Sequence, residues 1–340
     1  MQKILQTGLS AGMSSASGYH SSKPKPCPRE LDGANLQPSS FQPTPSSRIS
    51  FPVAKGSPVE ASPICIGAWS WGDTATWHWD HETEWPRVQA AFQHLISSGI
   101  NFFDTAQAYG NGKSEELLGE LIKANNLPRD SYVIQTKWLG NMTQVSNLTH
   151  PSDAPYHTLK GSLKRLGLDY IDIYLVHGPI HIQSIASVAK SLHRCVEDGL
   201  TKAVGVANYD PDDLLKMQEE LEKGIVFQGY SSLAQGRLTG KYTQEHAPPK
   251  TYRFSSYDMG DIRQTVDTVK EVALKRGKEM ASVALNWSVC KGAVPVVGIR
   301  NLEQARQAVD ALGWRLTEEE MRQIDAVSVE GNRTALWQQG

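Results

Sequence analysis

Two spacings of hydrophobic residues alternate along most of the chain. From residue 61 onward, continuous apolar runs are separated by longer stretches in which apolar side chains recur every three or four positions. The continuous runs predict buried β-strands, and the periodic stretches predict amphipathic helices. The expected strands are 62–66, 100–103, 132–136, 170–176, 203–206, 225–228 and 293–297. The expected helices include residues 87–98, 114–122, 159–166, 185–196, 211–223, 261–276, 280–289 and 302–312.

The order of these elements constrains how the strands pair. Strands that alternate strictly with helices must pair in parallel, because each helix returns the chain to the starting end of the sheet. This pattern predicts an α/β fold of the (β/α)₈ TIM-barrel type, in which helices surround the strands. Only seven strands are recognisable, whereas such a barrel needs eight. Either one strand escapes recognition or the chain lacks one.

Reactive polar residues follow three consecutive predicted strands. Asp104 and Tyr109 come after the second strand, Lys137 after the third, and His177 after the fourth. The carboxyl ends of barrel strands meet at one face, where barrel enzymes carry their active sites. We therefore expect these four side chains to converge.

The four side chains suit the reduction of a carbonyl group. Such a reaction needs a proton donor for the developing alkoxide, and Tyr109 can supply that proton. An adjacent ammonium, Lys137, favours the phenolate and lowers the phenol pKa. Asp104 would keep Lys137 charged, and a neutral His177 would orient the substrate oxygen.

Composition narrows the classes of partner. The 34 basic and 36 acidic residues of this 340-residue chain are spread along it, so no basic patch for nucleic acid is expected. No apolar stretch approaches the ~20 residues that span a bilayer, so we expect a soluble protein without a membrane partner. The four cysteines show neither paired nor zinc-binding spacing. No carboxylate or cysteine pattern elsewhere in the chain accompanies His78 and His81 as a set of metal ligands, and no metal site is expected.

The first 60 residues differ from the rest. They are rich in Ser, Pro and Gly and show neither strand nor helix periodicity, which predicts a disordered leader over 1–60. The barrel is expected over 61–327 and a tail over 328–340. A cytoplasmic location is the first expectation. The alternative is organellar import, because the leader is Ser-rich and acid-poor, as transit peptides are. The oligomeric state is not predicted.

The motifs around the polar residues resemble those of the aldo-keto reductase superfamily. The resemblance rests on Gly99-Ile-Asn-Phe-Phe-Asp-Thr-Ala-Gln-Ala-Tyr-Gly110, on Lys137, and on Asp169-Tyr-Ile-Asp-Ile-Tyr-Leu-Val-His177, and it extends over residues 62–314. That superfamily folds as a (β/α)₈ barrel and reduces aldehydes and ketones with NADPH. The resemblance places its catalytic tetrad on Asp104, Tyr109, Lys137 and His177.

The resemblance also implies a set of NADPH-binding residues. Asn208 would bind the nicotinamide carboxamide, Tyr230 would stack on the ring, and Arg300 would lie near the ribose 2′-phosphate. The full expected set is Trp69, Asp104, Asn208, Tyr230, Ser231, Leu233, Gln235, Gly236, Lys241, Gly298, Arg300, Gln304 and Gln307. Two positions depart from the family pattern, since Ala207 replaces a serine and Ala308 an asparagine. We expect Trp69, Trp71, Trp77, Trp79 and Trp138 to wall the substrate pocket or to cap the barrel.

The family pattern accounts for the missing strand. Relatives carry a further strand and helix where residues 222–226 join the two flanking segments directly, so the sixth βα unit is absent near residue 224. Strand number, tilt and shear are linked, and a seven-stranded barrel must therefore open, re-pair or distort. Three functions stay open: an NADPH-dependent carbonyl reductase, an NADP(H)-binding barrel that regulates a protein partner, and an inactive splice or gene-model variant.

Overall fold

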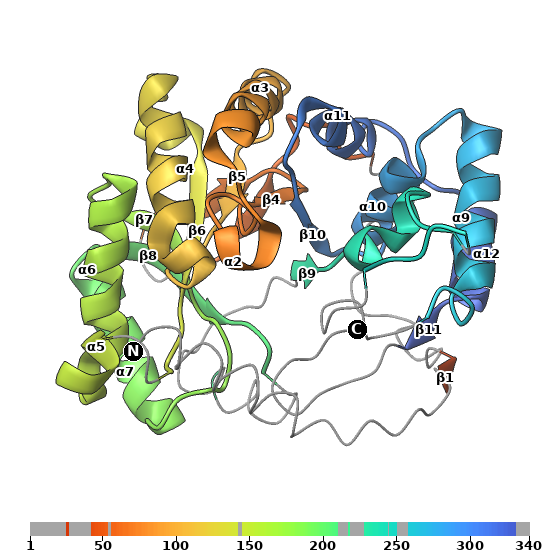
Figure 1. The fold of residues 1–340 in the computed structure, drawn as a ribbon. Coiled ribbons are helices and arrows are strands. Elements are labelled where there is room, and N and C mark those ends of the chain that lie inside the picture. Colours follow the sequence, from red (N-terminus) through yellow and green to blue (C-terminus); the bar gives the residue numbers. More distant parts are fainter. Residues whose placement is uncertain are drawn as a thin grey trace.

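A seven-stranded parallel sheet forms the centre of the molecule (Figure 1). The computed structural model describes residues 25–26, 42–53, 56–141, 145–209, 217, 228–243, 245–249 and 258–330. In spatial order the strands are β8 (Thr201–Val206), β7 (Ile171–Val176), β6 (Val133–Trp138), β5 (Phe102–Asp104), β4 (Cys65–Gly67), β10 (Val294–Gly298) and β9 (Gln228–Tyr230). Every neighbouring pair is parallel. Within the described residues, the predicted barrel type with seven strands is confirmed.

Helices flank the sheet on its outer side (Figure 1). The longer ones are α3 (His81–Ser97), α4 (Lys113–Ala124), α6 (Ala154–Leu166), α7 (Ile185–Glu197), α9 (Arg263–Arg276), α10 (Met280–Cys290), α11 (Leu302–Asp310) and α12 (Glu318–Ala326). The shorter ones are α2 (Thr74–Trp77), α5 (Val145–Thr149) and the 3₁₀ turns η2 (Tyr109–Gly112), η3 (Arg129–Ser131), η4 (Pro151–Asp153) and η5 (Ala234–Thr239). A two-residue pair, β1 (Lys25–Pro26) with β11 (Val329–Glu330), lies apart from the sheet.

The helix predictions need two corrections. Helix α3 begins at His81 and contains Pro86, although the sequence pattern predicts a start just after that proline. Helix α12 is absent from the prediction. It begins with a capping box in which the Thr317 and Glu320 side chains each accept from the other residue's backbone N–H. This short helix is mostly polar, and Ile324 is its one buried residue.

The strands alternate their side chains between two apolar cores. One core fills the layer between the sheet and the helices, and a second lies on the inner side of the curled sheet. The antiparallel hairpin β2 (Ile49–Phe51) and β3 (Val59–Ala61) contributes to this inner core, where Phe51 meets Phe102 edge-on with 5.5 Å between ring centroids. Regular structure thus begins inside the 1–60 segment. The sequence pattern does not predict this hairpin, because each of its strands has only three residues and is too short to show a period. The boundaries at residues 61 and 327 stay predictions.

Strands β8 and β9 are the two edges of the described sheet. Four of the six residues of β8 and all three of β9 keep part of their surface exposed, whereas β5, β6 and β7 are buried throughout. Residues 210–216 and 218–227 lie outside the described part of the chain. They hold the helix predicted near 211–223, the seam at 222–226 and most of the strand predicted at 225–228, of which the described β9 shares Gln228.

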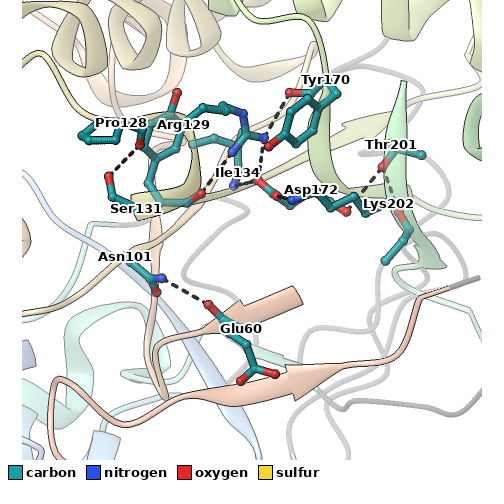
Figure 2. A network of polar contacts seen from close by, with 12 residues as sticks. Glu60, Asn101, Pro128, Arg129, Ser131, Ile134, Tyr170, Asp172, Thr201 and Lys202 are labelled. Atoms are coloured by element: carbon teal, nitrogen blue, oxygen red, sulfur yellow. Dashed lines mark hydrogen bonds and ion pairs between the residues drawn. The ribbon is translucent and has the colours of Figure 1, made fainter. Parts of the chain in front are cut away.

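A buried carboxylate joins three strands near their amino-terminal ends (Figure 2). Asp172 on β7 accepts hydrogen bonds at Oδ2 from Arg129 Nη2 at 2.7 Å and from the backbone N–H of Ile134 on β6 at 3.0 Å. Its Oδ1 accepts from Lys202 Nζ on β8 at 3.0 Å. The Arg129 guanidinium also lies 3.9 Å from the centroid of the Tyr170 ring. One carboxylate therefore holds β6, β7 and β8 in register.

Candidate active site

Three of the predicted catalytic side chains form one contact chain. Lys137 Nζ lies 2.5 Å from Asp104 Oδ1 and 3.1 Å from Tyr109 Oη. The same ammonium donates to the backbone oxygen of Thr105 at 2.9 Å. Asp104 and Lys137 are both buried. The three N–H groups of the ammonium are thus matched by three oxygen acceptors, and Lys137 is held between a carboxylate and a phenol.

The strand ends explain this convergence. Asp104 is the last residue of β5, and Lys137 is the penultimate residue of the neighbouring β6. Tyr109 reaches the same place from η2, where Gly110 and Asn111 adopt left-handed φ values of 55° and 57°. A Cβ on Gly110 would lie 2.9 Å from the carbonyl carbon of Gly72, so glycine is required for this turn to approach the β4–α2 loop.

His177 completes the group from the end of β7. Its backbone N–H donates to the oxygen of Trp138 at 2.7 Å, which extends the β6–β7 pairing beyond the strand. Its ring meets the Tyr109 ring edge-on, with 5.4 Å between centroids. Burial, with a smaller contribution from the Lys137 charge, lowers the pKa of His177 well below its usual range. The imidazole is therefore neutral near pH 7, as the sequence predicts.

The pKa of Tyr109 departs from the expected direction. Burial raises it, and the Lys137 ammonium lowers it by less, so the net direction is upward. The interaction with Lys137 has the predicted sign, but the loss of water around the phenol outweighs it. Tyr109 therefore keeps its proton through neutral pH, which is the state a proton donor needs.

The pKa of Lys137 is also raised. Burial alone lowers it, but the charge of Asp104 and then the contact with Tyr109 outweigh burial. The lysine is therefore an ammonium throughout the physiological range, and Asp104 is the group that keeps it charged.

Aromatic side chains divide between the site and the core. The Trp69 indole stacks on the Tyr109 ring with 5.4 Å between centroids and 17° between planes, and Trp77 meets Trp69 edge-on at 5.9 Å. Trp71 and Trp138 are fully buried, and their indole N–H groups donate to the Ile299 oxygen and the Asn147 side chain. Trp79 is also part of the outer core. Trp69 and Trp77 thus lie where pocket walls are expected, whereas the other three pack the barrel.

Two predicted nicotinamide contacts lie together at the open side of the sheet. Asn208 follows β8 in a left-handed conformation (φ 62°), and its Nδ2 donates to the backbone oxygen of His177 at 2.7 Å. Tyr230 at the end of β9 donates from Oη to Asn208 Oδ1 at 2.9 Å. The Tyr230 side chain is 45% exposed. One hydrogen bond therefore joins the ends of the two edge strands, next to the candidate catalytic group.

The loop predicted to hold the pyrophosphate is tightly wound. Ser231, Ala234 and Gln235 all have positive φ, and Gly236 follows with φ 90°. Gln235 Oε1 accepts from the guanidinium of the fully buried Arg237 at 3.0 Å. Leu233 caps η5, and the exposed Lys241 follows it. The buried Arg237 guanidinium thus packs against the loop, and the exposed Lys241 follows at its end.

Arg300, predicted near the 2′-phosphate, already has an anionic partner. Its Nε donates to Glu84 Oε2 at 2.7 Å, and its Nη2 donates to Glu84 Oε1. Its backbone N–H donates to Gln304 Oε1 at 2.7 Å at the start of α11, so this glutamine serves the turn. Gln307 on the same helix donates to Glu303. Gly298 ends β10 opposite Gly67. Sequence reasoning missed the contact between Glu84 and Arg300, because the two residues are 216 positions apart in the chain.

Two glutamines complete the surroundings of the tetrad. Gln135 on β6 donates from Nε2 to Asp104 Oδ1 at 2.7 Å. Gln228 on β9 exchanges two hydrogen bonds with Gln135. Gln135 is detectable in principle, since it lies two positions before Lys137 in an apolar strand and therefore points to the same side.

Metal and membrane features can be assessed for the described ranges. There, no cluster of three or more His, Cys, Asp or Glu side chains could hold a metal ion. His81 stacks against Trp85 with 5.5 Å between ring centroids. None of the helices within those ranges is long and apolar enough to cross a membrane. Cys65, Cys195 and Cys290 are buried free thiols.

Comparisons with known proteins agree with the geometry. The model of the aldo/keto reductase family matches residues 63–226 and 212–329, two segments that overlap over 212–226, which includes the expected seam. Pyridoxal reductase of Arabidopsis thaliana, a chloroplastic protein, is 31% identical over 83% of this chain and 87% of its own length. The NADH-specific methylglyoxal reductase of Escherichia coli is 27% identical over 76% of this chain and 92% of its own. The structure of glycerol dehydrogenase from Gluconobacter oxydans matches with a TM-score of 0.68 and 25% identity, over 83% of this chain and 95% of that one.

Proposed function

The chain belongs to the aldo/keto reductase family, and we propose that it reduces aldehyde or ketone groups to alcohols with NADPH, with Tyr109 as the proton donor. Family membership makes it an oxidoreductase that uses a nicotinamide cofactor and acts on small carbonyl compounds. The observation that carries the finer proposal is the contact chain from Asp104 through Lys137 to Tyr109, at 2.5 and 3.1 Å.

The side chains divide the proton chemistry between them. Tyr109 keeps its proton until the substrate oxygen gains charge, and it then donates from Oη. The Lys137 ammonium, 3.1 Å away, stabilises the phenolate that remains. Asp104 holds that ammonium in place, and the neutral His177 ring beside Tyr109 orients the substrate oxygen. When bound, the nicotinamide supplies the hydride.

The residues expected at the nicotinamide end and at the phosphate end of the cofactor suit NADPH. Asn208 offers an amide, and Tyr230 offers an exposed ring beside the tetrad. The loop at 231–236, with left-handed residues at 231 and 234–236, and Lys241 suit the pyrophosphate, because backbone amides and an ammonium bind anions. Arg300 would meet the 2′-phosphate. Gln304 and Gln307 would face the adenine, although each already has a hydrogen bond within α11 or its first turn.

Aromatic aldehydes are the first substrates to test. The partly exposed Trp69 indole stacks beside the proton donor, and an indole favours flat apolar ligands. One relative is a pyridoxal reductase and another a methylglyoxal reductase. With NADPH present, pyridoxal or 4-nitrobenzaldehyde should cause loss of the reduced nicotinamide absorbance faster than methylglyoxal does. Absence of turnover with every aldehyde, in protein that binds NADPH, would contradict the proposal.

The preference for NADPH should depend on Glu84. In Glu84→Gln, Arg300 loses a carboxylate that competes with a phosphate, so affinity for 2′,5′-ADP should rise about tenfold while affinity for 5′-AMP stays unchanged. Isothermal titration with these two fragments measures this without turnover. Glu82→Gln, exposed on the same helix, is the matched control. An unchanged ratio of the two affinities would show that Arg300 does not meet the 2′-phosphate.

Within the described residues β8 and β9 do not pair with each other, and this favours a second candidate, a barrel that is impaired or serves only to bind NADP(H). A folded site should gain thermal stability when NADPH is added, because ligand binds the native state alone. Stabilisation with turnover supports the reductase. Stabilisation without turnover supports the binding protein, and no stabilisation supports the inactive variant.

For location we propose the cytoplasm, with organellar import as the alternative. The chloroplastic relative keeps the alternative open. Fluorescent fusions of the full chain and of a chain lacking residues 1–41, which keeps the β2–β3 hairpin, should show the same distribution if the removed segment carries no address.

A further inference from the structure

A pair of glutamine amides crosses the inside of the curled sheet. Gln135 Nε2 donates to Gln228 Oε1 at 3.0 Å, and Gln228 Nε2 donates to Gln135 Oε1 at 2.8 Å. Gln135 Nε2 also donates to Asp104 Oδ1 at 2.7 Å, and this carboxylate oxygen is the one that contacts Lys137. Gln135 is 1% exposed. The amide pair is therefore in direct contact with the charged centre of the candidate active site.

The two glutamines come from opposite parts of the sheet. Along the sheet, β6 and β9 are separated by β5, β4 and β10 on one side, and on the other side lie β7, β8 and the open edge. On β6, Val133 belongs to the inner core and Lys137 to the catalytic group, so Gln135 between them also points inward. The pair thus spans the interior instead of lying between neighbouring strands.

The reciprocal pairing fixes which end of the Gln135 amide meets Asp104. An amide has a donating nitrogen and an accepting oxygen, and rotation by half a turn exchanges them. The Gln228 Nε2 donor holds Gln135 Oε1, and this leaves Gln135 Nε2 facing the carboxylate. Without Gln228, the oxygen of Gln135 could turn toward Asp104, where two acceptors would repel each other.

We propose that Gln135 and Gln228 are positioning residues that set how strongly Asp104 draws the Lys137 ammonium away from Tyr109. This inference rests on the proposed role of Tyr109 as proton donor. The Gln135 N–H satisfies part of the buried carboxylate, so Lys137 can be shared between Asp104 and the phenol oxygen. If that N–H is lost, the carboxylate draws the ammonium closer and Tyr109 loses the charge that lowers its pKa.

The consequence is a shift in the acidity of Tyr109. The charged and titratable groups that act on it are Lys137, Asp104 and Cys65, with the His177 ring beside it. Among these, Lys137 lowers the phenol pKa, whereas Asp104 and Cys65 raise it. In Gln135→Met, the influence of Lys137 should weaken and the tyrosine should ionise at higher pH. A weaker acid transfers its proton more slowly, so kcat should fall as well.

The test combines kinetics with a titration that needs no turnover. Gln135→Met should lower kcat about tenfold and move its alkaline limb upward by about one pH unit. Gln228→Met should shift both in the same direction by less, and the double variant should match Gln135→Met, because Gln228 acts through Gln135. An ultraviolet difference titration, in which each protein is compared with its own Tyr109→Phe form, reports ionisation of Tyr109 directly.

A matched control and the contrary outcomes separate this positioning role from a purely structural one. Gln107→Met removes another buried glutamine amide, which donates to the Leu139 oxygen at 3.3 Å, and should leave the titration of Tyr109 in place. If the Gln135 and Gln228 variants lose stability and kcat with no shift in that titration, or if their effects add, the positioning role is overturned. If the wild-type protein reduces no carbonyl, the proposed function fails, but a shifted titration would still support the inference.

Discussion

Replacing Tyr109 with phenylalanine should slow carbonyl reduction about 10³-fold, because the phenol is the proposed source of the proton. The ring remains, so its stacking on Trp69 and its edge contact with His177 should persist. Binding of NADPH, measured by fluorescence titration, should therefore stay within a factor of about two to three. The expected pattern is a large fall in kcat with little change in cofactor affinity.

A second tyrosine gives the control. Tyr132 is buried near the other end of β6, beside Arg129, and Tyr132→Phe should keep wild-type kcat. If Tyr109→Phe reduces aldehydes as fast as the wild-type protein does, Tyr109 is not the donor. The pH dependence supplies a further check. The pKa of Tyr109 is raised by burial, so reduction should persist through neutral pH and decline only as the pH rises through that elevated value.

Replacing Asp172 with alanine should destabilise the fold by about 3 kcal/mol, the lower end of the range for breaking a buried ion pair. The variant leaves Arg129 without its 2.7 Å partner, and it removes the acceptors for Lys202 and for the Ile134 N–H. The lower end applies because the Arg129 and Lys202 side chains are 22% and 41% exposed, and water can solvate them after the change.

Denaturant unfolding monitored by tryptophan fluorescence measures this loss. Glu116→Ala is the matched control, because Glu116 pairs with Lys113 at 2.9 Å on the surface, where both side chains are 45% exposed. Its cost should not exceed about 0.5 kcal/mol. Equal losses in the two variants would mean that Asp172 does not hold the three strands together. Asp172→Asn should fall between them, since an amide keeps one acceptor.

The sequence predicts the parts of the site that depend on one strand and its carboxyl end. Asp104, Lys137 and His177 converge because the order of strands along the chain is also their order in the sheet. Parallel pairing then brings the carboxyl ends of consecutive strands together, and the apolar runs in the sequence are enough to locate those strands. The fold class follows from the same regularity.

Side-chain contacts between segments that are far apart in the chain could not be predicted from the sequence. The pairs Gln135–Gln228 and Glu84–Arg300 join positions 93 and 216 apart, and no local pattern marks either one. The net pKa of Tyr109 also required the structure, because the extent of burial decides between two opposing effects. Similarly, no local pattern distinguishes Trp69, which lies partly exposed against the Tyr109 ring, from Trp71, which packs in the core.

The order of strands in the sheet also bears on how the chain assembles. Pairing of β6 with β7 brings together Gln135 and Ile173, whereas pairing of β10 with β4 brings together Val296 and Cys65 across a loop roughly six times longer. Direct closure of the longer loop costs about 1.6 kcal/mol more in chain entropy. Each added strand from β4 to β8 uses local contacts, so the tetrad can assemble before the last third of the chain has docked. We therefore expect folding to proceed from the strands around Tyr109 toward the segments that hold Tyr230 and Arg300.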